Sequence, residues 1–216
     1  MFKILENTPL FKKMKLEDIT SLISSNTHTM QKFIKESYIA YRGEEIPGIL
    51  IVINGSIQAE MLDDNGNVFP IEMRKPGDLV APAFIFGSGE YPVDLRVVSD
   101  AVIFVISKVI FTEMLQSNTQ LLQNFLTILS KNMSFLSNKI YFNFNHKTIE
   151  DKFMAYLQAH SEDRIAKITM NIEELAQFFQ VSRPSLSRVI AKLIEDKYII
   201  KLSKNNFKIL KPHLKH

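Results

Sequence analysis

The segment Ile172–Lys192 restricts the fold of this chain more than any other, because it carries the start signals of two short consecutive helices. Asn171 can cap the first helix, and two glutamates follow in the first turn, where the helix dipole favours negative charge. Ser182 can cap the second helix, and Pro184 falls in its first turn, where a missing N–H costs little. The spacing leaves a short turn between them and predicts a helix-turn-helix.

The two faces of the second predicted helix differ in chemistry. Its apolar face is formed by Leu186, Val189, Ile190 and Leu193. Its opposite face carries basic and hydroxyl side chains: Arg183, Ser185, Ser187, Arg188 and Lys192. Arginine can read guanine edges in the major groove, while hydroxyls and backbone N–H groups hold phosphates. We therefore expect this helix to read DNA; the alternative is an ordinary helical hairpin whose polar face meets water.

A β-hairpin is expected next, because the apolar runs Tyr198–Ile200 and Phe207–Leu210 flank the turn-forming Ser203–Asn206. Residues 147–216 hold 13 Lys and Arg against 8 Asp and Glu, whereas residues 1–146 hold 13 against 15. A basic end suits a polyanion, although a solvated lysine-rich surface would give the same excess. The predicted DNA-binding residues are Ser182, Arg183, Pro184, Ser185, Ser187, Arg188, Lys192, Lys204 and Lys208.

The first half of the chain predicts a different architecture. Residues 1–24 have helical spacing, and from Thr27 to Ser107 short β-branched and aromatic runs alternate with turn residues. Asn65-Gly66 supplies the positive φ angles that a tight hairpin turn needs. Several short strands at this spacing favour an antiparallel barrel or sandwich, and 46% apolar residues suffice for a core.

A long helix is expected after the strands. From Leu115 onward, apolar residues step by four and three: Leu122, Leu126, Leu129, Met133, Leu136 and Ile140. A second stripe lies beside them: Leu121, Phe125, Ile128 and Phe135. One stripe can face the strands while the heptad stripe faces a second copy of the chain. A single core helix buried all round is the alternative. The polar stretch Asn143–Lys147 is a plausible hinge, and residues 161–168 are expected to form a loop.

Several classes of protein are excluded or disfavoured. The chain has no cysteine, so disulfides, thiolate metal sites and cysteine-bound iron–sulfur clusters are excluded. No run of eighteen apolar residues and no signal-peptide pattern is present, so a cytoplasmic protein without a membrane partner is expected. We find no nucleophile elbow, no phosphate loop and no clustered His/Glu ligand set, which argues against an enzyme.

These features together resemble the cyclic-AMP receptor protein/FNR family of bacterial transcription regulators. The stretch Glu174–Val189 carries the resemblance, with Gly55 at the family's roll glycine and Gly77-Asp78-Leu79 at its Gly-Glu-Leu. The resemblance implies an α+β fold: an N-terminal antiparallel β-roll, cupin-like and cyclic-nucleotide-binding-domain-like, a long dimerisation helix and a C-terminal winged helix-turn-helix. The domains would be 1–110, 111–142 and 147–216.

The resemblance also assigns roles within the reading helix. Arg183 and Arg188 would read bases and Ser185 would contact phosphate. The position between Arg183 and Ser185 is often glutamate in the family, but here it is Pro184, so the family's usual half-site is not implied. The implied partners are double-stranded DNA with a near-palindromic operator, a second copy of the chain and RNA polymerase.

The sensor departs from the cyclic-nucleotide members of the family. Where these carry an Arg-Ser pair for the cyclic phosphate, alignment on Arg96 places Tyr91-Pro92, and Asp94 has the wrong charge. A buried phosphate without a cation is costly, so we expect no tight binding of cyclic AMP.

The stretch Ala81–Asp94, with Glu60–Asp63, resembles a subgroup that regulates hybrid-cluster protein and other nitrosative-stress genes and is thought to sense nitric oxide through haem. The predicted effector pocket is Met61, Met73, Phe84, Phe86, Tyr91 and Met133. Axial haem ligands would come from Met61 first, or from Met73, Met133, His28 and His146. A methionine is more often core filler, and a small organic effector or no ligand are alternatives. A haem- or metabolite-binding enzyme with an accessory helical domain is the competing function.

Overall fold

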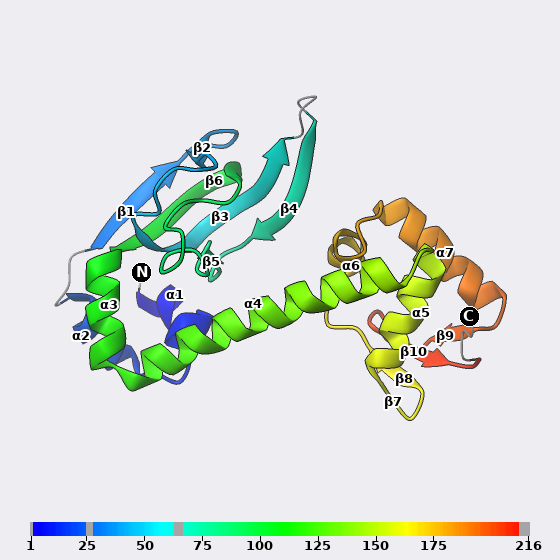
Figure 1. Ribbon diagram of the computed structural model, residues 1–216. Coiled ribbons are helices and arrows are strands. Elements are labelled where there is room, and N and C mark those ends of the chain that lie inside the picture. Colours follow the sequence, from blue (N-terminus) through cyan, green and yellow to red (C-terminus); the bar gives the residue numbers. More distant parts are fainter. Residues whose placement is uncertain (1, 25–27, 63–66, 212–216) are drawn as a thin grey trace. The chain divides into compact units, whose positions relative to one another are not determined.

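The computed structural model describes residues 2–24, 28–62 and 67–211, and it divides into two compact units, Met1–Asn132 and Met133–His216 (Figure 1). The division falls inside one helix, α4 (Thr119–Asn145), so that its two halves pack in different units. The division expected from the sequence, 1–110, 111–142 and 147–216, stays a prediction.

The first unit begins with short helices and continues as an antiparallel sheet. The helices are α1 (Phe2–Glu6), η1 (Pro9–Phe11) and α2 (Leu16–Ser24). The strands are β1 (His28–Phe33), β2 (Tyr38–Ala40), β3 (Gly48–Leu62), β4 (Val68–Arg74), β5 (Leu79–Val80) and β6 (Asp94–Ser107). Their order is β1-β6-β3-β4, with β2 on β6 and β5 on β3. The predicted antiparallel roll is confirmed.

The hairpin between β3 and β4 forms where the sequence predicts one, since Leu62 pairs with Val68. The predicted turn residues Asn65-Gly66 lie outside the described residues. Strand β3 is longer than expected, because it joins the two runs Gly48–Ile53 and Ser56–Leu62 into one strand.

Gly55 explains how β3 continues through a register shift against β6. Its φ is +82°, and a Cβ there would lie 2.3 Å from the carbonyl oxygen of Asp100 and 2.7 Å from the Cα of Ala101. Only glycine tolerates both the left-handed backbone and this close approach of two strands. The glycine singled out in the sequence is therefore required by the irregular pairing of β3 with β6.

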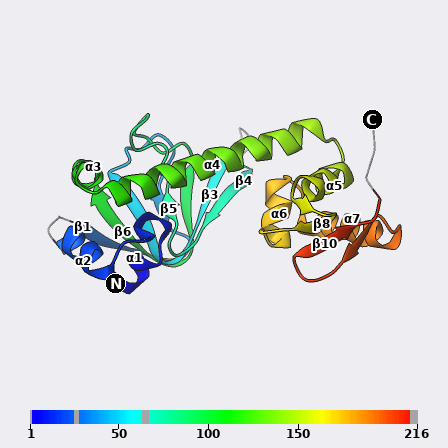
Figure 2. The ribbon, with the colours of Figure 1, turned by 90° about the horizontal axis from the view of Figure 1, so that it is seen from below.

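The long helix differs from the expectation at its start. Two helices follow β6, namely α3 (Lys108–Ser117) and α4, and they are separated by Asn118 in an extended conformation. The Asn118 Oδ1 accepts from the backbone N–H of Leu121 at 2.9 Å, which caps α4. Viewed from below, α4 runs across the roll (Figure 2), and its buried Leu121 and Phe125 join the core of the first unit.

The second unit contains three more helices and a four-stranded sheet. The helices are α5 (Ile149–Ala159), α6 (Ile172–Phe178) and α7 (Arg183–Glu195). The strands are β7 (Ser161–Glu162), β8 (Ile165–Lys167), β9 (Ile199–Lys201) and β10 (Asn206–Ile209), in the order β7-β8-β10-β9. The predicted wing is present as the antiparallel pair β9–β10.

One local prediction for this unit is wrong. Residues 161–168 were expected to form a loop, but β7 and β8 form a hairpin through Asp163 and Arg164, both with positive φ. The strands are too short to show an alternating pattern, and β8 is held by its pairing with β10, far away in sequence. In the described part of the chain, no helix is long and apolar enough to cross a membrane.

Candidate nucleic-acid interface and effector cavity

The helix-turn-helix is built from two capped helices, as the sequence predicts. The Asn171 side chain accepts from the backbone of Glu174, and the Glu174 carboxylate accepts from the backbone of Asn171, which together form a capping box. The Ser182 hydroxyl accepts from the backbone N–H of Ser185 and so caps α7. Pro184 lies in the first turn of α7, where no intrahelical N–H bond is lost.

The turn between the helices falls at Gln180-Val181, where the sequence places it, but the sequence does not predict the backbone conformation that Gln180 adopts there. Gln180 has a φ of +56°, in the left-handed region that glycine and asparagine usually occupy. Two backbone bonds hold it there: the N–H of Gln180 donates to Gln177, and the N–H of Val181 donates to Ala176. Gln180 therefore fixes the path from α6 into α7.

The predicted apolar and polar faces of α7 are both observed. Leu186, Ile190 and Leu193 are buried in the core of the second unit. Of the nine predicted DNA-binding residues, all are exposed except Ser185, which is half-buried. The Ser185 hydroxyl lies 2.8 Å from the Ser182 hydroxyl, so part of its hydrogen-bonding capacity is used within the cap.

The wing presents its lysines on the side away from the core. Phe207 and Ile209 are buried, and Lys208 between them is exposed, as strand alternation requires. Lys204 is exposed in the turn between β9 and β10. The structure thus places both lysines on the surface of the unit that carries α7.

Neither arginine of the reading helix is held firmly. Arg183 lies 3.7 Å from the Glu173 carboxylate, and both side chains are more than half exposed. The Arg188 Nε donates to the Pro184 carbonyl at 3.4 Å. Exposed pairs of this kind contribute little, so both guanidinium groups can turn toward DNA at small cost.

The C-terminal half of α4 is attached to α6. The Asn143 Nδ2 donates to the Phe178 carbonyl at 2.8 Å, and the Lys152 Nζ donates to Asn143 Oδ1 at 2.7 Å and to the Phe179 carbonyl at 3.2 Å. Burial lowers the pKa of Lys152. The Phe135 ring packs on Phe178 at 5.3 Å. These contacts fix the last turns of α4 to the end of α6.

Replacing Asn143 with alanine is expected to lower the free energy of unfolding by about 1–3 kcal/mol, because the Phe178 carbonyl and the Lys152 ammonium each lose a partly buried partner. Chemical denaturation measures the loss. The matched control is Asn138→Ala, which removes an exposed asparagine of the same helix. Equal stability of the two variants would contradict the role given to Asn143.

The predicted heptad stripe on α4 is largely exposed. Leu126, Met133, Leu136 and Ile140 are more than half exposed, Leu122 is 37% exposed, and Leu129 is half-buried. In the second stripe, Leu121, Phe125 and Ile128 pack on the first unit, whereas Phe135 packs on Phe178 in the second. Apolar side chains at heptad spacing are thus left open to solvent along one face of a long helix.

The six predicted effector residues are spread over the chain. Met61, Phe84, Phe86 and Met133 are more than a third exposed, Met73 is half-buried and Tyr91 is buried. Phe86 stacks on Phe111 at 6.2 Å instead of closing a pocket. Burial raises the pKa of Tyr91 to about 12, and the charge of Glu44 adds to the shift.

Acidic residues flank the segment in which Tyr91 and Pro92 lie. The backbones of Glu90 and Glu45 pair in an isolated antiparallel β-bridge, and the Asp94 carboxylate accepts from the backbone N–H of Arg42 at 2.8 Å. Arg96, the arginine used for alignment, already bonds two carboxylates. The surroundings of this segment are therefore acidic.

The pairing of Arg96 is specific. Its Nε donates to both carboxylate oxygens of the buried Glu60, at 3.0 and 3.2 Å, and its Nη1 donates to the Glu36 carboxylate at 2.9 Å. The Tyr38 hydroxyl also donates to Glu60, at 2.9 Å. The hydrogen bond with Glu60 raises the pKa of both Arg96 and Tyr38. The Arg96 charge is thus compensated.

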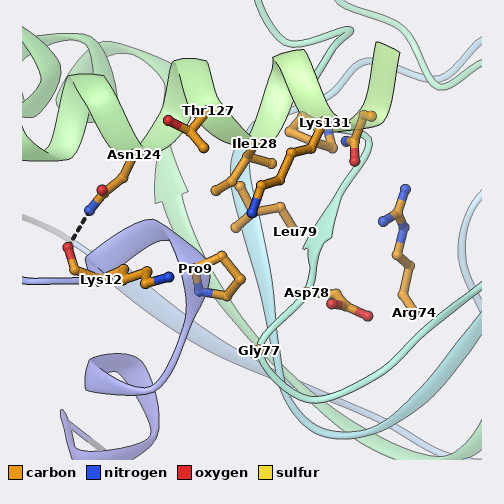
Figure 3. Close-up of a pocket in the computed structure, with 12 residues that line it drawn as sticks. Pro9, Lys12, Arg74, Gly77, Asp78, Leu79, Asn124, Thr127, Ile128 and Lys131 are labelled. Atoms are coloured by element: carbon orange, nitrogen blue, oxygen red, sulfur yellow. Dashed lines mark hydrogen bonds between the residues drawn. The ribbon is translucent and has the colours of Figure 1, made fainter. Parts of the chain in front are cut away.

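A cavity of about 210 Å³ lies elsewhere in the first unit (Figure 3). Its walls come from the segment after α1, the turn between β4 and β5, and one face of α4. The lining residues are Pro9, Lys12, Arg74, Gly77, Asp78, Leu79, Pro82, Asn124, Thr127, Ile128, Lys131 and Asn132. None of the six predicted effector residues is among them. Sequence reasoning missed this cavity, because its walls are far apart along the chain.

This cavity does not fit haem. The volume of the cavity lies below the 300–1,000 Å³ typical of pockets for drug-sized ligands. None of the five candidate axial ligands lines the cavity. His28 packs 5.1 Å from Phe104, and His146 stacks on Phe142 in the second unit. Among the described residues, no group of three or more His, Asp or Glu side chains could hold a metal ion.

Comparison with known proteins supports the architecture. Residues 30–118 match the cyclic nucleotide-binding domain family. No curated protein matches the sequence. A solved transcriptional regulator of Thermotoga maritima is 26% identical, with a TM-score of 0.53, over 60% of this chain and 97% of that one.

Two further solved structures match over nearly the whole chain. The catabolite activator protein of Thermus thermophilus is 17% identical over 94% of this chain and 93% of its own, with a TM-score of 0.52. CprK, solved in complex with OCPA, is 13% identical over 92% of each chain, with a TM-score of 0.63. These likenesses show the shared fold.

Proposed function

Because residues 30–118 belong to the cyclic nucleotide-binding domain family and the chain has the fold of the Crp/Fnr transcription regulators, we propose that it is a homodimeric, sequence-specific DNA-binding regulator. The observation that carries the proposal is the exposed basic face of α7. The N-terminus of this helix is capped, and its opposite face packs in the core of the second unit. The protein is not an enzyme in this proposal.

The binding mode follows from the placement of α7. Its N-terminal residues enter the major groove, Arg183 and Arg188 contact base edges, and Lys204 and Lys208 of the wing contact the backbone. A dimer formed through the exposed stripe of α4 would bind two half-sites about 34–36 Å apart, one helical turn of DNA, in a near-palindromic operator. An effector in the first unit would shift the population between weak and strong DNA-binding geometries.

The test is operator binding by purified protein. Fluorescence anisotropy with fragments of its own promoter region should reveal a duplex that is bound at least a thousandfold more tightly than a shuffled duplex of equal length, the lower end of known specificity ratios. Measurements at several salt concentrations separate the electrostatic contribution. Uniform affinity for every duplex would exclude a sequence-specific regulator.

The effector in this proposal is not cyclic AMP. The acidic residues around Tyr91 and the compensated charge of Arg96 disfavour a cyclic phosphate there. Calorimetry on the full chain is expected to give a Kd for cyclic AMP of about 1 mM or weaker, because a buried phosphate needs a cation. Micromolar affinity would contradict this expectation.

The remaining sequence hypotheses stay predictions. Haem with Met61 as an axial ligand, and with it nitric-oxide sensing under nitrosative stress, needs a site other than the cavity. A Soret band on reconstitution with haem, lost in Met61→Leu, would support it. Contact with RNA polymerase and a place in the cytoplasm belong to the proposed regulator. A haem- or metabolite-binding enzyme is the alternative function.

A further inference from the structure

The cavity of the first unit is built from three separate parts of the chain. Pro9 and Lys12 come from the N-terminal segment, Asp78 from the turn between β4 and β5 and Leu79 from β5 itself, and the third wall is α4 (Figure 3). All of these belong to one compact unit. A molecule in the cavity would therefore contact α4 together with both other segments.

Asn124 holds the N-terminal wall in place. It is 9% exposed, and its Nδ2 donates to the carbonyls of Leu10 at 2.9 Å and Lys12 at 2.7 Å. Its Oδ1 accepts from the Gln120 side chain at 3.0 Å. The backbone of Lys12 is thus tied to α4 without any ligand, so the site is largely preformed, and a ligand has little ordering cost to overcome.

The cavity has two cations without a counter-charge. In the described part of the chain, neither Lys12 nor Lys131 lies within ion-pair distance of a carboxylate. Arg74 differs, because it pairs with Glu72 at 2.6 Å. Two uncompensated ammonium groups that line one small cavity attract an anion.

The rest of the cavity limits what that anion can be. Pro9, Leu79 and Ile128 present apolar surface beside the ammonium group of Lys131, and the Asp78 carboxylate lies on the Arg74 side (Figure 3). The cavity of about 210 Å³ is too small for a nucleotide. The Asp78 carboxylate disfavours a ligand with a second anionic group at the end of the cavity near Arg74.

We propose that this cavity binds a small organic carboxylate, with its anionic group between Lys12 and Lys131 and its short hydrocarbon body against Leu79 and Ile128. Since the ligand would join the N-terminal segment to α4, it is a candidate effector, and that regulatory consequence rests on the proposed function. Binding itself does not.

Calorimetry on the full chain with butyrate, acetate and inorganic phosphate tests the site. Butyrate is expected to bind more tightly than acetate or phosphate, because only butyrate fills the apolar part. Lys12→Met and Lys131→Met should each raise the butyrate Kd about tenfold, since each removes one charge-assisted contact. Lys32→Met, which removes an exposed lysine of β1 outside the cavity, should leave the Kd unchanged.

Asp78→Asn gives a result that misfolding cannot imitate. Loss of the opposing charge should lower the butyrate Kd several-fold, while the asparagine oxygen can still accept from the Lys75 N–H. Phosphate bound as tightly as butyrate, no binding of any of the three anions, or equal affinities in the Lys12, Lys131 and Lys32 variants would each overturn the proposal. Arg188→Ala should retain butyrate binding while losing operator binding, so a failure of the DNA-binding proposal is distinguishable from a failure of this one.

Discussion

Replacing Arg188 with alanine is expected to remove most sequence-specific operator binding while the protein stays folded. Arg188 is exposed in the middle of α7, where its Nε donates a long hydrogen bond to the Pro184 carbonyl. An arginine that reads guanine supplies about 1–3 kcal/mol of discrimination at its base pair, and a dimer loses this at both half-sites. Anisotropy titrations against the operator and against single-base variants measure both effects.

Lys208→Ala is the matched comparison. A lysine that contacts phosphate should weaken binding to all duplexes alike and reduce the slope of log affinity against log salt by about one. Arg188→Ala should instead leave binding to non-operator DNA nearly intact and flatten the preference at one position. If the two variants lost affinity in the same uniform way, α7 would not be the reading helix.

Leu126→Glu is expected to convert the proposed dimer into a monomer. Leu126 is 52% exposed and lies in the heptad stripe of α4, where a partner helix would bury it. A carboxylate at both copies would be desolvated next to its symmetry mate. Sedimentation should show the mass of one chain, and operator affinity should fall by about 10²–10⁴-fold, the contribution of a second tethered site.

Asn138→Glu controls for the added charge, because it lies on the same helix outside the heptad stripe and is exposed. It should remain dimeric. A wild-type chain that sediments as a monomer at micromolar concentration would contradict the dimer, and the exposed stripe would then need another partner.

The parts of the fold that the sequence predicts are those with local causes. Asn171 and Ser182 were expected as caps from their positions before amphipathic stretches, and both accept the expected backbone bonds. The resemblance to the Crp/Fnr regulators is confirmed by the shared fold. By contrast, the hairpin of β7 and β8 depends on the pairing of β8 with β10. These two strands are far apart in the sequence, so the residues next to Asp163 do not predict the pairing.

The candidate sites also differ in whether their causes are local in the sequence. The reading face of α7 is visible in the sequence because helical spacing alone sorts its residues into two faces. The cavity is not visible, because Lys12 and Lys131 line one cavity only after α4 packs against the N-terminal segment through Asn124. The turn at Gln180-Val181 is visible between the two capped helices, but the positive φ of Gln180 is not, since glutamine rarely adopts the left-handed conformation.

The contacts between α4 and α6 determine how a rotation of the end of α4 affects the helices that follow it. The sequence predicts a hinge at Asn143–Lys147, but the side chains of Asn143 and Lys152 both donate to carbonyls at the end of α6, and Phe135 packs on Phe178. A twist applied to the last turns of α4 therefore passes to α6, and through the short turn at Gln180 to α7. These contacts oppose a change in the angle of α7 relative to the last turns of α4.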